Sequence, residues 1–363
     1  MIACTSFSPD DSKVLYPTYD SKAGDFGVGL YDRQTGKAAT LFMTLELSPD
    51  EPEGEPALIR PQWLADGRHI LVSWGREADE DDLNLAVLPY GHSGPIRLMH
   101  VQGLEDGVSQ MRMPLATARG QLVLLGESNA LVCVHLLTGE ISRHPMPKGV
   151  MPYATADGDR VCYLSQSDEH KGEWEMGVID LDTWDLKPVS KIKLEEDLGD
   201  DALVVVSPDG KWALGYDEEK VEVVFIENGV EESRVAVCGE AEKVSLGVFA
   251  ISPISRTAYA PYFREHEGGT NVSVGIVEFP FPRGEPRRTV LIERMEEPDD
   301  GEALYFQPSV SHDGKTLAIA STYLVAGDQQ TKKDDCALFL IDLTDAERKV
   351  TRVPIEQPPT DLD

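Results

Sequence analysis

The stretch Ser207-Pro208-Asp209-Gly210-Lys211 decides the fold, because it separates two short apolar runs at 202–206 and 212–214. Proline presets φ at the first corner of a turn, aspartate bonds back to its own backbone, and glycine accepts the positive φ of a tight hairpin. The stretch therefore predicts a strand, a tight turn and a second strand.

Variants of this unit recur along the whole 363-residue chain. They lie about 50 residues apart, which is the length of one four-stranded blade of a β-propeller. We therefore predict an all-β, seven-bladed β-propeller with four-stranded antiparallel blades. Six or eight blades are the alternatives, because the third unit lacks the Pro and Asp of the others. The turns end at Asp11, Gly67, Gly120, Gly158, Gly210, Ser255 and Gly314.

A repeat at this period predicts a single propeller domain, 1–363, rather than several domains. The last eight residues, 356–363, contain Pro358-Pro359, and we expect a loose tail there. The predicted blades span about 2–41, 59–101, 113–146, 150–192, 201–238, 245–292 and 304–355.

Closure of the ring depends on the two ends of the chain. The chain begins in the innermost strand of the first predicted blade, 2–7, and ends in the outermost strand of the last, 351–355. Neither end supplies a strand to the other's blade. We therefore predict that the ring closes by packing alone; the alternative is that the start of the first blade is placed wrongly in this alignment.

The repeat resembles a known family. Each repeat begins with an apolar residue, followed by Ser-Pro-Asp-Gly-Lys and a second apolar run. Another strand then leads to an Asp-x-x-Thr-Gly turn, such as the one at 32–36. This pattern is similar to the TolB-like propeller repeat, a relative of WD-repeat blades, and covers nearly the whole chain. The resemblance implies the fold but little about function, because such blades occur in transport accessories, peptidase gating domains, lactonases, lyases and scaffolds.

The net charge of −31 limits the partners. Binding to nucleic acid or to an anionic membrane needs clustered Lys and Arg, so we expect the protein to bind neither of them. We also expect the protein to be a monomer. No signal peptide is visible and no apolar segment is long enough to span a bilayer. We expect a cytoplasmic protein, or a periplasmic one if a leader has been removed.

The five cysteines fit neither a zinc site nor a disulfide framework, because they are far apart and odd in number. Most lie inside apolar strand runs. We expect buried free thiols.

Most of the negative charge lies in two kinds of connection, those from the second to the third strand of a blade and those from one blade to the next. Summed over these connections the charge is about −27, on about a third of the chain. In a propeller both kinds lie on the same face. The densest acidic stretches are 50–55, 77–82, 195–201, 217–219 and 296–302.

Aromatic and Arg side chains interleave with this charge and are our candidate binding residues. Such residues carry much of the binding energy at interfaces, and acidic surroundings speed encounter with a basic partner. The alternative is that the connections are merely solvated and the aromatics cap the cores of the blades. The candidates are Tyr19, Trp74, Arg76, Trp174, Tyr216, Tyr262, Arg264 and Tyr323.

No cofactor is predicted, and we assign no catalytic residue. The run 77–82 could hold calcium through its carboxylates, but it lacks the spacing of a calcium-binding loop. The eight histidines form no paired metal motif, although His170 and His266 fall in long connections. No nucleophile elbow, phosphate loop or dinucleotide fingerprint is present.

Two functions remain open. The first is a non-catalytic scaffold that binds a basic protein or peptide through its acidic face. The second is a hydrolase or lyase acting on a small polar or sugar-like substrate at the central channel, with carboxylates from several blades as acid and base. We favour the scaffold and expect no enzymatic activity.

Overall fold

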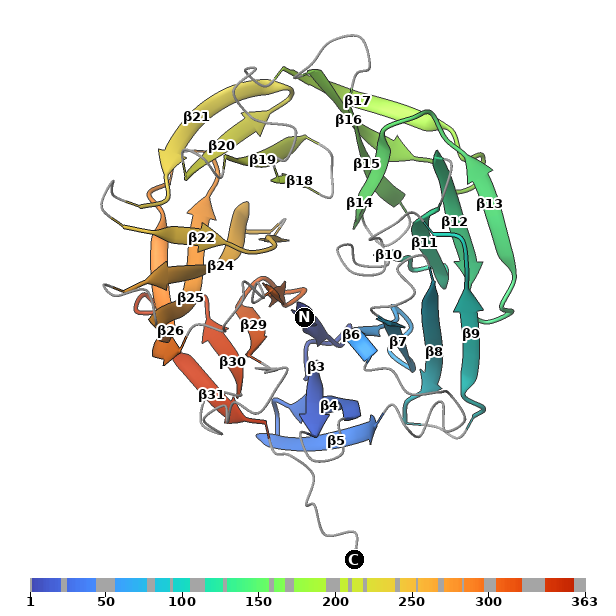
Figure 1. The fold of residues 1–363 in the computed structure, drawn as a ribbon, viewed down its shortest axis with the longest axis horizontal. Helices are drawn as coiled ribbons and strands as arrows, with labels where there is room; N and C mark the ends of the chain where they lie inside the picture. The colour runs from blue at the N-terminus through green and yellow to red at the C-terminus, as the bar shows by residue number, and fades with distance from the viewer. Residues whose placement is uncertain are drawn as a thin grey trace, which may run out of the picture.

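The computed structural model shows seven antiparallel sheets arranged as a ring (Figure 1). The prediction of a seven-bladed propeller is therefore confirmed. Between Ile2 and Ile355 no α-helix occurs in the residues that the structure describes, and none of their elements is a helix able to cross a membrane. The structure describes residues 2–20, 25–43, 56–76, 82–91, 94–104, 115–126, 129–156, 160–166, 173–193, 203–207, 211–217, 221–238, 242–252, 254–266, 271–282, 284–296, 305–321 and 337–355.

Strands follow one another from the inside of the ring to the outside in each blade. Blade 1 contains β2 (Ser6–Phe7), β3 (Lys13–Asp20), β4 (Asp25–Asp32) and β5 (Lys37–Met43). Blade 2 contains β6 (Pro56–Trp63), β7 (His69–Arg76), β8 (Leu83–Pro89) and β9 (Arg97–Val101). Blade 3 contains β10 (Leu115–Ala116), β11 (Gln121–Gly126), β12 (Ala130–His135) and β13 (Ile141–Pro145). Blade 4 contains β14 (Val150–Ala156), β15 (Arg160–Gln166), β16 (Glu173–Ile179) and β17 (Leu186–Lys193).

The remaining blades follow the same order, except that the inner strand of blade 6 is divided into two short pieces. Blade 5 contains β18 (Leu203–Val206), β19 (Trp212–Asp217), β20 (Glu222–Glu227) and β21 (Val230–Ala236). Blade 6 contains β22 (Val244–Leu246), β23 (Ala250–Ser252), β24 (Thr257–Glu265), β25 (Asn271–Pro280) and β26 (Arg287–Glu296). Blade 7 contains β28 (Ser309–Val310), β29 (Thr316–Ser321), β30 (Ala337–Asp342) and β31 (Val350–Pro354).

Hydrogen bonds within the first hairpin of a blade explain why the repeated motif needs Ser and Asp. In blade 7 the Ser311 hydroxyl donates to Asp313 at 2.7 Å and accepts from the Thr316 N–H at 2.9 Å. The Asp313 carboxylate accepts in turn from the Lys315 N–H at 3.0 Å. Blade 1 repeats the arrangement, with Ser8 donating to Asp10 at 2.6 Å. Serine therefore closes the turn, and aspartate holds its corner.

The two atypical turns keep this geometry with other residues. In blade 3 the Thr117 hydroxyl accepts from the Gln121 N–H at 3.2 Å, as the motif serine does elsewhere, and Gly120 has φ +71°. In blade 6 the left-handed residue is Arg256, with φ +49°, one position after the predicted end at Ser255. The repeat thus survives the loss of Pro, Asp and Gly.

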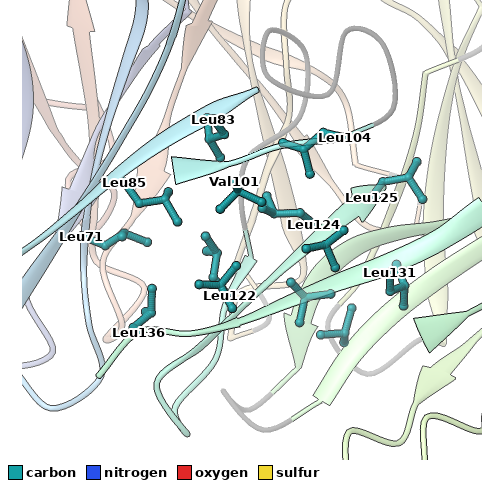
Figure 2. Close-up of a cluster of buried hydrophobic side chains, with 14 of the residues drawn as sticks. Leu71, Leu83, Leu85, Val101, Leu104, Leu122, Leu124, Leu125, Leu131 and Leu136 are labelled. Atoms are coloured by element: carbon teal, nitrogen blue, oxygen red, sulfur yellow. The ribbon is translucent and has the colours of Figure 1, made fainter. Parts of the chain in front are cut away.

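Neighbouring blades pack through continuous apolar layers. Between blades 2 and 3, leucines and valines from both sheets interdigitate and are almost completely buried (Figure 2). The strands that supply them are apolar without alternation, because each sheet is covered on both faces. Cys4, Cys133 and Cys162 are buried free thiols, and burial raises the pKa of Cys4 to about 11.

Three blades share a pairing that the sequence reading missed. A tyrosine in the second strand lies opposite a glycine in the third, and the register shifts by one residue beside that glycine. A Cβ on the glycine would lie 2.4–2.5 Å from the tyrosine ring, so a larger residue would force the ring or the strands to shift. The pairs are Tyr16 with Gly29, Tyr163 with Gly177 and Tyr262 with Gly275.

The ring does not close by packing alone, so that prediction is wrong. The predicted first strand, 2–7, is divided in two, and its first half, β1 (Ile2–Cys4), pairs in parallel with β27 (Tyr305–Gln307) next to blade 7. Only the second half, β2, belongs to blade 1. A main-chain ladder therefore joins the two ends of the ring, and the N-terminus lies inside it (Figure 1).

Side chains strengthen the seam between blades 1 and 7. The Asp11 carboxylate accepts from the backbone N–H groups of His312 at 2.8 Å and Asp313 at 2.9 Å. Arg33 donates to the Thr316 hydroxyl at 2.6 Å, and also to the carbonyl of Asp11 itself. Hydrogen bonds from the hairpins of blade 1 thus hold the first hairpin of blade 7 in place.

Candidate interaction surfaces

The antiparallel order of each blade sorts its connections by side. Connections from second to third strands and from blade to blade leave the strands on one side, while the two hairpin turns of each blade lie on the other. We call the first side the acidic face. The densest acidic stretches, 50–55, 77–82, 195–201, 217–219 and 296–302, lie outside the described residues except for Asp82, Asp217 and Glu296.

The hairpin side has a different charge. Its described turns contain eleven Asp and Glu against eight Lys and Arg. Several of the carboxylates serve their own turns. Backbone N–H bonds, chiefly from Thr35, lower the pKa of Asp32, and the Lys187 ammonium, together with backbone N–H bonds, lowers the pKa of Asp180. The excess of negative charge therefore belongs to the connections of the acidic face.

Four of the candidate aromatics are buried in the cores of the blades. Trp74 and Trp174 each keep less than a tenth of their surface exposed, and Tyr216 and Tyr262 keep 2% each. Tyr216 packs beside Phe249, and burial raises the pKa of Tyr262. Their side chains serve packing, so we leave these four out of the binding surface.

The other candidates are placed less completely. Tyr19 lies in β3 opposite Phe26, and Arg76 lies in β7 opposite Pro56. Tyr323 lies outside the described residues.

Arg264 belongs to a described cluster at the acidic face between blades 5 and 6. Glu242 accepts from Arg288 at 2.9 Å and lies 3.5 Å from Arg264, and the Arg288 guanidinium lies over the ring of Tyr262, 5.7 Å from its centre. Lys243 pairs with Glu265 at 2.8 Å. At this place opposite charges neutralise one another, which ties the connection between the two blades to blade 6.

The candidate histidines and the candidate calcium run form no metal site among the described residues. His266 is within 2.7 Å of the Ser273 hydroxyl, and His170 lies outside the described residues, as does 77–81 of the predicted calcium run. Asp82, which completes that run, instead pairs with His100 at 3.0 Å. Among the described residues no three metal-binding side chains come together.

The innermost strands contain almost no ionisable groups. β1, β2, β6, β10, β14, β18, β22, β23, β27 and β28 contain no Asp, Glu, His or Lys. Their one Arg, Arg60, is 1% exposed, and burial lowers its pKa to about 10, so it keeps its charge at neutral pH.

The outermost strands are basic. Together β5, β9, β13, β17, β21, β26 and β31 contain eleven Lys and Arg against four Asp and Glu. Only β21 is net acidic. Basic side chains on an edge strand oppose pairing with another edge, which protects an exposed sheet. Charge thus follows position: acidic connections on one face, apolar inner strands and a basic outer edge.

No family model and no curated protein sequence matches the chain. Several solved structures match it. A periplasmic gluconolactonase from Pseudomonas aeruginosa has a TM-score of 0.53 at 14% identity, with 94% of this chain and 96% of that chain covered. A chain of the mitotic checkpoint complex scores 0.50 at 13% identity, covering 88% and 87%. A protein from Lactobacillus plantarum scores 0.50 at 12% identity, covering 94% and 95%. At these identities the likeness shows the propeller fold alone.

Proposed function

We propose that the protein is a non-catalytic scaffold that binds a basic protein or peptide segment through its acidic face. The observation that carries the proposal is the separation of charge by position: the connections of one face hold about −27 of the net −31, while the hairpin side mixes both signs. A face of one sign attracts partners of the other sign and speeds their encounter.

The composition of the inner strands supports a binding role over catalysis at the channel. Acid–base chemistry on a small substrate needs a pair of titratable groups close to the reacting atoms. The described inner strands supply no Asp, Glu, His or Lys for such a pair. The likeness to a gluconolactonase does not favour lactone hydrolysis here, because it rests on the fold.

Charge reversal tests the proposal. The variant E195K/E196K/D197K changes the acidic face by six charges, and E140K/E285K/E347K makes the same change in three exposed hairpin turns. We expect the first variant to bind a fluorescent Arg-rich peptide at least tenfold more weakly than wild type, and the second to bind within twofold. Equal losses in both, or none in the first, would overturn the proposal.

A turnover assay provides the second arm. We expect no hydrolysis of a sugar lactone above the rate without protein. Saturable turnover that disappears in a single-residue variant would show that the protein is an enzyme. The scaffold interpretation would then be abandoned, whatever the result of the peptide assay.

A further inference from the structure

The charge cluster between blades 5 and 6 interrupts the acidic face. Its described side chains are three cations, Lys243, Arg264 and Arg288, and two carboxylates, Glu242 and Glu265. Neutralisation within the cluster is therefore incomplete, because these five groups sum to +1. The connections of the same face sum to about −27. A partner that binds this face meets a local excess of positive charge at the cluster.

The two arginines share Glu242 unequally. Arg288 donates to Oε2 of Glu242 at 2.9 Å, whereas Nη1 of Arg264 lies 3.5 Å from Oε1. Arg288 also donates to the carbonyl of Val237, and its guanidinium lies over the ring of Tyr262, 5.7 Å from the ring centre. These contacts hold Arg288 in place, and only 25% of its side chain is exposed.

Arg264 is held more loosely than Arg288. Its side chain is 41% exposed, and the long contact with Glu242 is its one ion pair within the described part of the chain. Glu265, the next residue, pairs with Lys243 at 2.8 Å instead. A guanidinium has five N–H donors, so Arg264 keeps donors for a ligand. The positive charge that the described carboxylates leave over therefore lies mainly on Arg264.

We infer that Arg264 determines which basic segments the acidic face accepts, by binding an Asp or Glu side chain within the partner segment. The inference rests on the proposed function. A planar guanidinium can donate two parallel N–H bonds to one carboxylate, which fixes the position of the segment as well as holding it. The contact is thus a matter of specificity more than of affinity.

The alternative occupant of this position is a Lys or Arg of the segment. Such a side chain would meet like charge within the Debye length of about 8 Å, so a uniformly basic segment fits the cluster less well. The acidic surroundings still attract the segment that we propose, because a single carboxylate leaves its net charge positive.

Two synthetic peptides test the inference. Each has four arginines on either side of a central residue, which is Glu in one peptide and Gln in the other. The ratio of their dissociation constants is measured for wild type and for R264Q, so that the cycle isolates the contact from general charge effects. We expect the Glu peptide to lose about threefold relative to the Gln peptide in R264Q, which is within the range measured for exposed ion pairs.

Two further variants make the test specific. R68Q removes the same charge from an exposed turn on the hairpin side and should leave the ratio of wild type unchanged. E242Q removes the carboxylate that competes for Arg264 and should shift the ratio toward the Glu peptide, an effect that a merely structural ion pair would not have.

The outcomes separate the inference from the proposed function. Equal ratios in wild type and R264Q, or the same change in R68Q, would overturn the inference and leave the proposed function standing. Failure of both peptides to bind wild type would overturn the proposed function, and this inference with it.

Discussion

Replacing Asp11 with glycine tests how the ring is closed. Asp11 has φ +56°, in the left-handed region where Gly67 and Gly314 stand in the matching turns of blades 2 and 7. Glycine is therefore compatible with the turn, and the substitution removes only the carboxylate that bonds the hairpin of blade 7.

The expected loss follows from the bonds that Asp11 makes. A hydrogen bond to a charged group contributes about 1.5–3 kcal/mol, and Asp11 accepts two from backbone N–H groups. The relief of left-handed strain and the extra backbone entropy of glycine in the unfolded chain are each about 1 kcal/mol and opposite in sign. We expect Asp11→Gly to lower the free energy of unfolding by about 3 kcal/mol.

Urea unfolding followed by tryptophan fluorescence measures this loss. Hydrogen exchange of β1 and β27 shows its place, because an opened seam should exchange faster there than in β15 or β20. Asp32→Gly is the matched control, since the Asp32 carboxylate also accepts two backbone N–H bonds but only within its own turn. A change below about 0.5 kcal/mol, or faster exchange at the seam in the control, would refute the reasoning.

Three further predictions concern packing and charge. Gly177→Ala should lower the free energy of unfolding by about 1–3 kcal/mol, because its Cβ would lie 2.5 Å from the Tyr163 ring; calorimetry of the variant measures this. Glu278→Gln should cost about 2–4 kcal/mol in urea unfolding, since Glu278 is 3% exposed and binds Arg348 of the next blade through both oxygens. Hydrogen bonds, chiefly from the Ser8 hydroxyl, lower the pKa of Asp10 to about 2. The contribution of Asp10 to stability is therefore present above about pH 4 and is lost as the pH falls toward 2. Acid unfolding of wild type compared with Asp10→Asn should show this difference.

The fold could be predicted because its signal is local and repeated. Each Ser-Pro-Asp-Gly unit specifies a hairpin through hydrogen bonds within six residues, as at Ser311–Thr316, and the period counts the blades. Where the motif is weak, at Gly120 and Arg256, the spacing still places the turn within one residue. A periodic local signal is therefore enough for the architecture.

Closure of the ring has no such signal. The parallel pairing of Ile2–Cys4 with Tyr305–Gln307 joins residues about 300 positions apart, and neither stretch carries a motif for it. The tyrosine–glycine pairs could have been found, since Tyr16 and Gly29 are thirteen positions apart, as are Tyr262 and Gly275.

Sequence also could not separate binding aromatics from core aromatics. Trp74 and Trp174 lie at strand positions where both faces of the sheet are covered, so no alternation marks their side chains as buried. The side of the ring on which the charged connections lie was easier to predict than the burial of the aromatic side chains, because each kind of connection leaves an antiparallel blade on one side.

The salt dependence of peptide binding tests the central claim most directly. The claim is that the acidic face, rather than net charge in general, binds the basic partner. We predict that the affinity of the Arg-rich peptide for wild type and for E140K/E285K/E347K falls steeply and equally as salt rises, while E195K/E196K/D197K shows a much shallower slope. Equal slopes for the two triple variants would contradict the claim, because the binding would then report only the total charge of the protein.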